Sequence, residues 1–508
     1  MKPTISDTRS YWEKSAKTPE FPALQKNLEV DVVVIGAGLT GITTAYLLKK
    51  AGAKVALVEQ YRCVHGDTNN TTAQLTYVTD LSFRDLVDYH GKENARLTWE
   101  AGRTALQQIA TIVEEEKIDC DFRRVPGYKQ GRLFDPKPSD YDKLKKEAEL
   151  IRSTGFEAKF LEEVPYFKRP GIEFPNQALF HPKKYLAALL KTIPGEGCYV
   201  FENSKVTEFE EKPLQVLIEE NRIKTKLIVI ATHVPLQGKV GTLAATLFQT
   251  KLTSYSSYVL GAKIAPGLLR YSTYWDISEP YYYLRIDPFE GGDYAIFGGR
   301  DHKTGQEDDT EKCFQRLTED FLSFFPEAVI DSYWSGQVVE TFDGLPFIGE
   351  ISPGQFIATG FTGNGMTFGT IAALMARDLF LEKENSWQKL FDVHRKSLKG
   401  GLADYLRENK DYPTYFVKDH LIKRNGNLGI VARGEGKVIH YNGKKVAAYR
   451  SDSDKLTLLT AICPHMGCIV HWNPAMKTWD CPCHGSRFSC DGKVIAGPAE
   501  TDLEKVAS

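Results

Sequence analysis

Hydrophobic residues gather first in a short run at positions 30–35, which is apolar and mostly β-branched. Such a run is typical of a strand that is buried on both faces of a parallel sheet. A glycine-rich turn, an apolar helical stretch over 42–51 and a second apolar run over 54–58 follow in order. Residues 227–232 predict another buried strand, and residues 329–382 return to a strand–turn–helix pattern. The pattern predicts an α/β part with a parallel sheet.

The segments between these runs have other patterns. Amphipathic, charged stretches near 93–117 and 139–154 predict helices. Residues 250–300 are rich in Tyr and alternate with apolar positions, which predicts an antiparallel sheet. After the polar stretch 399–418, the last ninety residues carry hairpin signals such as 441–444 and no long helical pattern. We therefore expect an α/β (α+β) chain that ends in a small all-β domain.

Composition narrows the class of protein. The 508 residues are 42% hydrophobic and 26% charged, ordinary values for a globular chain of roughly three domains. The formal net charge of −2 provides no basic field for nucleic acid. No apolar stretch approaches the roughly 18 residues of a membrane span, and the first residues lack a signal-peptide core. We expect a cytoplasmic protein without a nucleic-acid partner or membrane insertion.

The turn after the first strand contains Gly36, Gly38 and Gly41 in a Gly-x-Gly-x-x-Gly spacing. The first glycine permits a tight bend, the second lets a pyrophosphate approach the backbone, and the third allows close helix–strand packing. Glu59 ends the second strand, where an acid accepts a ribose hydroxyl. This unit predicts a dinucleotide site, and both NAD and FAD fit it.

Five of the nine cysteines lie between positions 463 and 490, which favours a metal site over a disulfide scaffold. Cys463 and His465 form one Cys-x-His pair, and Cys481 and His484 form a Cys-x-x-His pair. Two thiolates and two imidazoles suit a Rieske [2Fe–2S] centre, in which the cysteines hold one iron and the histidines the other. A zinc ion uses the same donors, so the four ligands alone leave both metals open.

Two later segments, 343–349 and 357–367, identify the dinucleotide unit more closely. Together with the glycine turn they resemble the D-amino-acid-oxidase/glycine-oxidase superfamily of FAD enzymes, over roughly residues 28–395. The resemblance implies FAD as cofactor, with the helix that begins near 366 directing its first amides at the flavin. The further residues that it implies at the FAD site are Thr71, Thr72, Val206, Gly360, Gly363, Asn364, Gly365, Met366 and Thr367.

The C-terminal segment from about residue 421 resembles Rieske ferredoxin domains, most closely those of the quinol–cytochrome c reductase type. That type implies a disulfide between Cys468 and Cys483, and a hydrogen bond from Ser486 to a cluster sulfur. High-potential relatives have Tyr where this chain has Phe488, so we expect an intermediate reduction potential. His471, just outside the motif, is predicted to be a surface residue.

The chain also departs from the pattern of amino-acid oxidases. Residues 335–341 contain no Arg or Lys where those enzymes carry an Arg for the substrate carboxylate. Arg285 and Arg300 are candidate replacements, although each fits an ordinary salt bridge. The residues at 69–70 are Asn, where covalent relatives need His, so FAD is expected to bind non-covalently.

Eight aromatic residues crowd into positions 255–283. They fit either the core of a sheet or an aromatic pocket for a cationic amine, and both interpretations stay open.

These patterns predict three regions. An FAD-dependent oxidoreductase spans 28–398, with FAD-binding parts near 28–80, 200–240 and 330–398 and substrate or cap parts near 81–199 and 241–329. A linker covers 399–420, and the Rieske domain covers 421–508.

The leading interpretation is an FAD-dependent oxidoreductase that oxidises a small organic substrate, an amine or amino-acid derivative, and passes electrons through the cluster to an external acceptor. An electron-transfer protein without a substrate of its own is the alternative, and redox sensing through the disulfide is a third. Histidines outside the cluster motif include no pair at helical spacing, which argues against a mononuclear-iron oxygenase.

Overall fold

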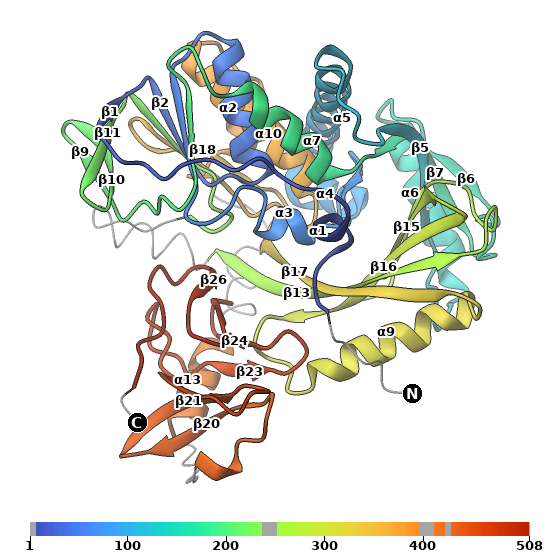
Figure 1. Cartoon of the computed structure of the whole chain (residues 1–508). Helices are drawn as coiled ribbons and strands as arrows, with labels where there is room; N and C mark the ends of the chain where they lie inside the picture. The colour runs from blue at the N-terminus through green and yellow to red at the C-terminus, as the bar shows by residue number, and fades with distance from the viewer. Residues whose placement is uncertain (1–6, 236–250, 396–410, 422–427, 507–508) are drawn as a thin grey trace.

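The computed structural model describes residues 7–235, 251–395, 411–421 and 428–506. The chain forms an α/β part, a large mixed sheet and a small β module, and the small module lies below the other two (Figure 1). The predicted combination of an α/β part, an antiparallel sheet and a small all-β domain is confirmed. In the described part of the chain, every helix is too short or too polar to cross a membrane.

A six-stranded sheet forms the centre of the α/β part, in the order β18-β19-β12-β2-β3-β8. Neighbouring strands are parallel except for the β18–β19 hairpin. The bounds are β2 Val32–Ile35, β3 Val55–Val58, β8 Tyr199–Phe201, β12 Leu227–Ile230, β18 Phe347–Ser352 and β19 Gln355–Thr359. Every residue of β2, β3 and β12 is buried, which explains why these strands are continuous apolar runs.

Helices cover this sheet, and a second small sheet lies beside it. Helix α2 (Leu39–Lys50) packs against α10 (Gly365–Phe380), and α10 also packs against α5 (Lys92–Glu115). The second sheet has the order β1-β11-β10-β9. Its bounds are β1 Leu28–Glu29, β9 Glu208–Glu211, β10 Leu214–Ile218 and β11 Asn221–Lys224.

The large sheet has nine strands in the order β17-β13-β16-β15-β14-β5-β7-β4, with β6 added at β7. Its pairs are antiparallel except for β5 and β14, which run parallel. The bounds are β4 Gln74–Leu75, β5 Arg123–Gln130, β6 Lys159–Leu161, β7 Gly171–Leu179, β13 Leu252–Ile264, β14 Thr273–Asp276, β15 Tyr283–Phe289, β16 Gly292–Lys303 and β17 Val329–Thr341. The antiparallel sheet predicted from residues 250–300 therefore extends into segments on both sides.

Other helices surround these sheets, and α9 (Thr310–Phe324) packs along β13 and β16. The remaining helices of this part are α3 Asp67–Asn70, α4 Phe83–His90, α6 Ser139–Arg152, α7 Pro182–Thr192 and α11 Gln388–Phe391. Helix α1 (Tyr11–Ser15) precedes the predicted start at residue 28, yet its Trp12 is fully buried. The segment before residue 28 is therefore part of the packed structure.

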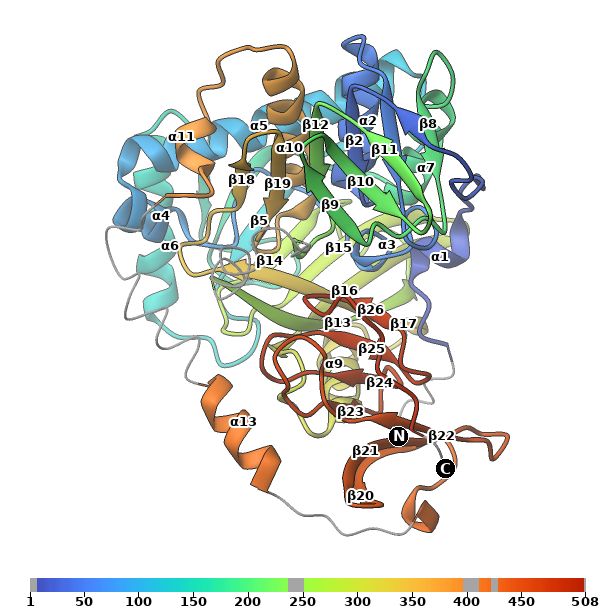
Figure 2. The same ribbon diagram turned by 90° about the vertical axis from the view of Figure 1, so that its left-hand side faces the viewer.

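The C-terminal module lies beneath β13 and β17 of the large sheet in both views (Figures 1 and 2). It has a three-stranded sheet, β20-β21-β22, and a four-stranded sheet, β23-β24-β25-β26. The bounds are β20 Gly436–Tyr441, β21 Lys444–Arg450, β22 Leu456–Thr460, β23 His471–Asn473, β24 Thr478–Asp480, β25 Arg487–Ser489 and β26 Val494–Ala496, with a short 3-10 turn at Leu428–Ile430.

Helix α13 (Asp411–Leu421) lies in the stretch predicted as a linker. Its Phe416 packs against the core of the C-terminal module. The described end of the predicted linker is therefore a helix that packs against the module. The local sequence did not indicate this contact, because the residues that Phe416 packs against lie elsewhere in the chain.

Candidate functional site

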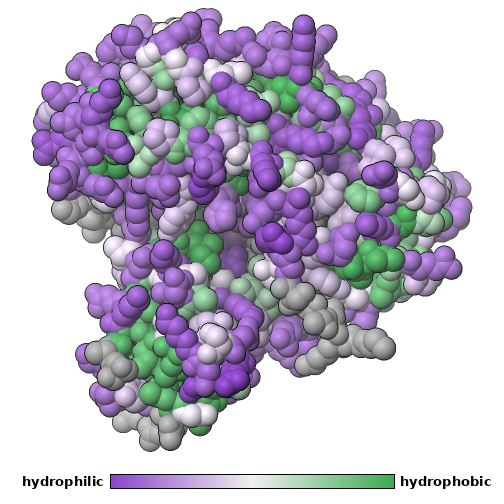
Figure 3. Space-filling view, viewed as in Figure 1, coloured by the Kyte–Doolittle hydropathy of each residue, from purple (hydrophilic) through white to green (hydrophobic). Residues whose placement is uncertain are grey.

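A cavity of about 840 Å³ lies between the α/β part, the large sheet and the C-terminal module. The surface is hollowed where the module meets the body above it (Figure 3). The cavity is lined by Gly36, Gly38, Glu59, Thr71, Thr72, Val206, Gly363, Asn364, Gly365 and Met366. Gly41, Gly360 and Thr367 lie outside the lining, although the sequence predicts them in the same site.

The glycine turn has the geometry of a cradle for a phosphate group. Gly36 has φ +97°, and a Cβ there would lie 2.6 Å from the carbonyl oxygen of Ala231. A Cβ at Gly41 would overlap the carbonyl oxygen of Gly36, so only glycine lets α2 approach the turn this closely. Gly41 therefore acts through packing, as its place in the motif predicts.

Glu59 lies beside this turn at the end of β3. Its carboxylate accepts hydrogen bonds from the backbone amides of Ala37, at 2.8 Å, and Tyr61, at 2.9 Å. Burial is the largest influence on the group and raises the pKa of Glu59. The arrangement holds an acid at the cavity wall, and the predicted ribose contact stays a prediction.

The start of α10 is joined to the loop before α4. Asn364 accepts a hydrogen bond from the amide of Asp80 through Oδ1 and donates one from Nδ2 to the carbonyl of Val78, each at 3.1 Å. Gly363 has φ +74°, and a Cβ there would overlap the Asp80 carboxylate. The first turn of α10 therefore faces the cavity with Asp80 directly against it.

The loop 67–73 is held through its backbone carbonyls by buried side chains. Trp12 Nε1 donates to the carbonyl of Thr71 at 2.6 Å, and Trp334 Nε1 donates to that of Asn70 at 2.9 Å. Arg285 donates to the carbonyls of Thr72 and Ala73 at 3.2 and 2.7 Å. Three segments far apart in the chain thus fix the position of one cavity wall.

Arg285 and Arg300 do not lie in the cavity lining, so the structure agrees with the salt-bridge alternative for both and not with a role at a substrate carboxylate. Arg285 is buried and pairs with Asp287 at 2.6 Å besides holding loop 67–73. Arg300 pairs with Asp320 at 2.5 Å. Both guanidinium groups serve internal contacts.

The Tyr-rich segment divides between core and cavity. Tyr258 and Tyr274 are buried in the core of the large sheet, whereas Trp275, Tyr281 and Tyr283 line the cavity. The core interpretation therefore holds for Tyr258 and Tyr274, and a pocket for a cationic amine stays a prediction for the residues that line the cavity.

The four predicted metal ligands meet on two loops of the C-terminal module. The thiols of Cys463 and Cys481 contact each other, and the hydrogen bond from Cys481 is the largest influence lowering the pKa of Cys463. The rings of His465 and His484 have centroids 4.9 Å apart and cross at 88°. Burial lowers the pKa of each histidine to about 4, so both imidazoles are neutral donors at pH 7.

The two loops have matching turns and a covalent link. The amide of Gly467 donates to the carbonyl of Cys463, and the amide of Gly485 donates to that of Cys481, each at 3.0 Å. A disulfide joins Cys468 to Cys483, and the sulfur of Cys481 lies within 4.8 Å of both bonded sulfurs.

Ser486 is fully buried behind the second cluster loop. Its Oγ accepts a hydrogen bond from the backbone amide of Ala499 at 2.9 Å. Its hydroxyl also hydrogen bonds to Cys463 and lowers the pKa of that thiol. Because a hydrogen-bond donor stabilises a thiolate, the Ser486 hydroxyl favours the ionised form of Cys463.

A family model described as FAD dependent oxidoreductase matches residues 31–379, and one described as Rieske [2Fe-2S] domain matches residues 425–507. The chain belongs to the FAD-dependent oxidoreductase family. The resemblance inferred from the sequence is thereby confirmed. The oxidoreductase uses FAD and carries a Rieske [2Fe–2S] cluster, and its glycine cradle and two-Cys, two-His donor set suit these groups.

Relatives match either the whole chain or one part of it. YhfW of Bacillus subtilis (strain 168), named as a Rieske 2Fe-2S iron-sulfur protein, is 34% identical over 98% of this chain and 97% of its own. The cytochrome b6-f complex iron-sulfur subunit of Chlorobaculum tepidum is 41% identical over 16% of this chain and 44% of its own. The structure of glycine oxidase from Geobacillus kaustophilus has a TM-score of 0.61 at 17% identity, covering 73% of this chain and 100% of that one, which shows the fold.

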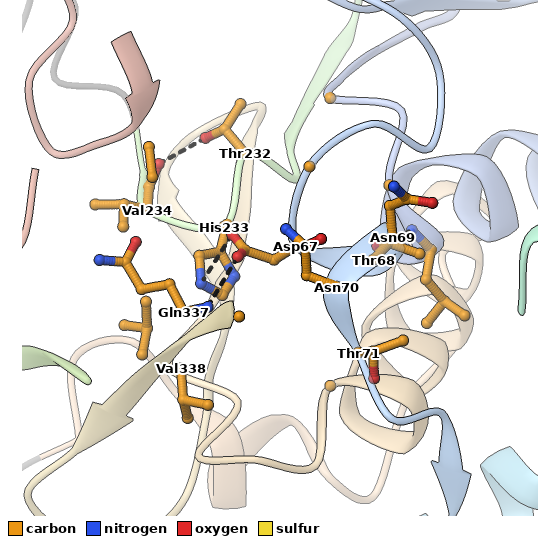
Figure 4. A pocket seen from close by; sticks show the side chains of 18 of the residues that line it. Asp67, Thr68, Asn69, Asn70, Thr71, Thr232, His233, Val234, Gln337 and Val338 are labelled. Carbon is orange, nitrogen blue, oxygen red and sulfur yellow. Dashed lines mark hydrogen bonds and ion pairs between the residues drawn. The ribbon is translucent and has the colours of Figure 1, made fainter. Parts of the chain in front are cut away.

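The Rieske domain is attached directly to the wall of the cavity. Gln337 on β17 donates from Nε2 to the carbonyl of Gly485, the residue after the predicted ligand His484, at 2.7 Å. Its backbone amide donates to the carboxylate of Asp67 in loop 67–73 at 3.1 Å, and Asp67 also lies 3.6 Å from His233 (Figure 4). One residue therefore joins the cavity wall to a cluster loop.

Two neighbouring contacts complete this junction. Gln306 Nε2 donates to the carbonyl of Pro482 at 2.9 Å. His471 bridges the carbonyl of Gly305 and the carboxylate of Asp419, each at 2.9 Å. His471 is half-buried between domains, which corrects its prediction as a surface residue.

Sequence reasoning missed Asp80, Ser257, Asp301 and Gln337, all of which line the cavity. Asp80, Ser257 and Asp301 are single polar residues in segments with no motif, and Gln337 lies in the stretch 335–341, which drew attention only for its missing Arg. Only the fold brings them to one place.

Proposed function

We propose that this oxidoreductase oxidises a small organic substrate, an amine or amino-acid derivative, and passes the electrons through the Rieske centre to an external one-electron acceptor. The observation that carries the proposal is the hydrogen bond from Gln337 to Gly485, because it attaches a cluster loop to the wall of the FAD cavity. A fused, docked carrier makes the second transfer effectively intramolecular.

We assign the FAD site to the cavity-lining residues of the glycine turn, Glu59, loop 67–73 and the start of α10. The glycine turn offers backbone amides and the dipole of α2 to the pyrophosphate. We assign the cluster ligands as Cys463, His465, Cys481 and His484.

The reaction converts a CH–NH unit of the substrate into C=N: the carbon loses hydride, which carries both electrons, and the nitrogen loses a proton to solvent. When bound, FAD supplies the two-electron acceptor and the cluster a one-electron carrier, so that the acceptor outside is reduced twice per turnover. The chain contributes orientation: loop 67–73 is fixed by Trp12, Trp334 and Arg285. Rigid positioning of this kind is what proteins add to cofactor chemistry.

The alternative, an electron carrier without a substrate, is less well supported. The cavity extends beyond the glycine turn to a wall of Trp275, Tyr281 and Tyr283. Concave aromatic surfaces with a few convergent polar groups are typical of sites for small molecules.

An anaerobic titration of the purified holoprotein with amines and amino acids tests the proposal. Flavin bleaching is followed by absorbance and the reduced cluster by EPR. We expect one class of compound to bleach the flavin and a Rieske signal to grow afterwards. If no compound bleaches the flavin while dithionite produces a normal Rieske signal, the substrate-oxidising function is wrong and the carrier function replaces it.

A further inference from the structure

Two carboxylates face the aromatic end of the cavity. Asp80 follows loop 67–73 and lies against the start of α10, and Asp301 is on β16 of the large sheet. Asp80 is exposed and Asp301 is half-buried, and both side chains line the cavity. Burial is the largest influence on each group and raises the pKa of Asp80 to about 6 and that of Asp301 to about 7.

Hydroxyl groups orient both carboxylates. Tyr281 donates its hydroxyl to Asp80 Oδ2 at 2.8 Å, and Ser257 donates to Asp301 Oδ1 at 2.6 Å. Ser257 has one hydroxyl hydrogen and gives it to Asp301, so Tyr283, at 2.5 Å, donates to Ser257. Each carboxylate thus accepts a hydrogen bond from a hydroxyl group, and hydrogen bonds of this kind favour the ionised form.

The described residues provide no positive charge to neutralise this pair. No Lys, Arg or His among them forms an ion pair with Asp80 or Asp301. Lys129, the nearest cation to influence Asp80, is bonded to Glu147 at 2.8 Å. When the two carboxylates ionise, the described part of the chain therefore offers them no counter-ion, and a ligand that supplies positive charge gains favourable electrostatic energy.

The cavity wall suits a cation and not a carboxylate. The ring centroids of Tyr281 and Tyr283 are 5.7 Å apart, and Trp275 lines the same end. Electron-rich ring faces attract ammonium groups and repel anions. A zwitterionic amino acid would place its own carboxylate beside two others.

We propose that the aromatic end of the cavity binds a short diamine or polyamine that lacks a carboxylate, with Asp80 and Asp301 each pairing with one protonated nitrogen. This inference rests on the proposed function, because it names the substrate class of that site. It also accounts for the absence of an Arg or Lys from residues 335–341.

Anaerobic calorimetry on the dithionite-reduced holoprotein, whose flavin cannot accept hydride from the probes, measures the binding of three matched probes apart from their oxidation. The probes are 1,4-diaminobutane, butylamine and 4-aminobutanoate, which differ in charge at one end of a four-carbon chain. We expect the diamine to bind about 10- to 100-fold more tightly than the monoamine, the range for one charged hydrogen bond, and the amino acid to bind weakest.

Two isosteric variants locate the charges. Asp80→Asn and Asp301→Asn are each expected to remove most of the diamine's advantage over the monoamine, about 10-fold or more. Both retain an oxygen to accept the existing hydroxyl, which protects the fold. Asp88→Asn, an exposed acid on α4, is the control and should leave all three affinities unchanged.

The pH dependence is a second readout. Tyr281 and Lys129 influence Asp80, whereas Ser257, Tyr283 and Asp80 itself influence Asp301. Since the carboxylates ionise as pH rises, diamine affinity should rise between pH 5 and 8, and Asp301→Asn should remove the part centred near pH 7.

Tighter binding of 4-aminobutanoate than of the diamine would overturn the inference, as would unchanged affinities in both Asn variants. Flavin bleaching by an amino acid alone would also overturn it while leaving the proposed function intact. Failure of every compound to bleach the flavin would instead remove the proposed function itself.

Discussion

Replacement of Gly305 by alanine tests whether the contact between the large sheet and the cluster loop carries electrons. Gly305 has φ +79°, and a Cβ there would lie 2.8 Å from the carbonyl carbon of Cys481 and from the nitrogen of Pro482. Gly291 has φ +80° with nothing within 4 Å of its Cβ position. The two alanine variants therefore share the backbone strain, and only Gly305→Ala pushes on the cluster loop.

The magnitude follows from the overlap. Carbon atoms normally approach to about 3.5–4.0 Å, so the loop must retreat by roughly 0.7 Å or more. Overpacking of this kind costs about 1–3 kcal/mol, whereas the positive φ costs each variant about 1–2 kcal/mol. The difference between Gly305→Ala and Gly291→Ala corresponds to about 5- to 140-fold in the docking equilibrium.

Light-driven anaerobic reduction of the flavin, with oxalate as the electron donor, provides the assay. Absorbance follows the flavin, and EPR of freeze-quenched samples follows the cluster. We expect Gly305→Ala to slow cluster reduction by about that factor and to leave the rate of flavin reduction unchanged. Dithionite-reduced samples measure the cluster content of each variant and correct for any loss.

The reasoning would be refuted if the cluster in Gly305→Ala is reduced as fast as in Gly291→Ala while thermal unfolding shows that the clash has its expected cost. In that case the electrons leave the flavin by a route that does not depend on this docked position. A Gly305→Ala protein that is slow only because it lacks cluster would be recognised by its spin count.

Three further outcomes are expected. Gly41→Ala should purify without FAD, measured by the flavin-to-protein absorbance ratio, because a Cβ there overlaps the carbonyl oxygen at the start of the glycine turn. Replacing Cys468 and Cys483 together by Ser should lower the free energy of unfolding of the C-terminal module by about 2–4 kcal/mol, measured as cluster loss in denaturant; an unchanged midpoint would contradict this. Ser486→Ala should lower the cluster potential by several tens of mV and Phe488→Tyr should raise it, by redox titration, since hydroxyl donors to the cluster stabilise its reduced state.

The structure shows what residues 335–341, which lack an Arg, contact in this protein. Gln337 lies in that stretch, on β17, and its side chain donates to the Rieske domain at Gly485. The stretch in which an Arg was expected from the resemblance to amino-acid oxidases here contributes Gln337 to a domain junction. The change therefore fits both a substrate without a carboxylate and a docked electron carrier.

The sequence by itself determined those parts of the protein whose chemistry is local. The glycine turn needs three glycines at fixed spacing because backbone atoms lie against Gly36 and Gly41, so the motif is readable in six residues. Likewise, two short turns place the predicted ligands Cys463 and His465, and Cys481 and His484, close together, so their spacing is readable in the sequence. Continuous apolar runs identified β2 and β3 because every residue in them is buried.

Only the tertiary structure decided which distant residues share the cavity. Asp80 and Asp301 are single acids 221 positions apart, and no periodicity connects them. The sheet and α10 bring them to one end of the cavity, and burial there raises the pKa of both. Arg285 was likewise a candidate for binding a substrate carboxylate on its charge alone. The structure shows that its guanidinium group instead binds Thr72, Ala73 and Asp287 of the chain itself. Local geometry leaves a signature in neighbouring residues, whereas electrostatic environment depends on what the whole fold places around a group.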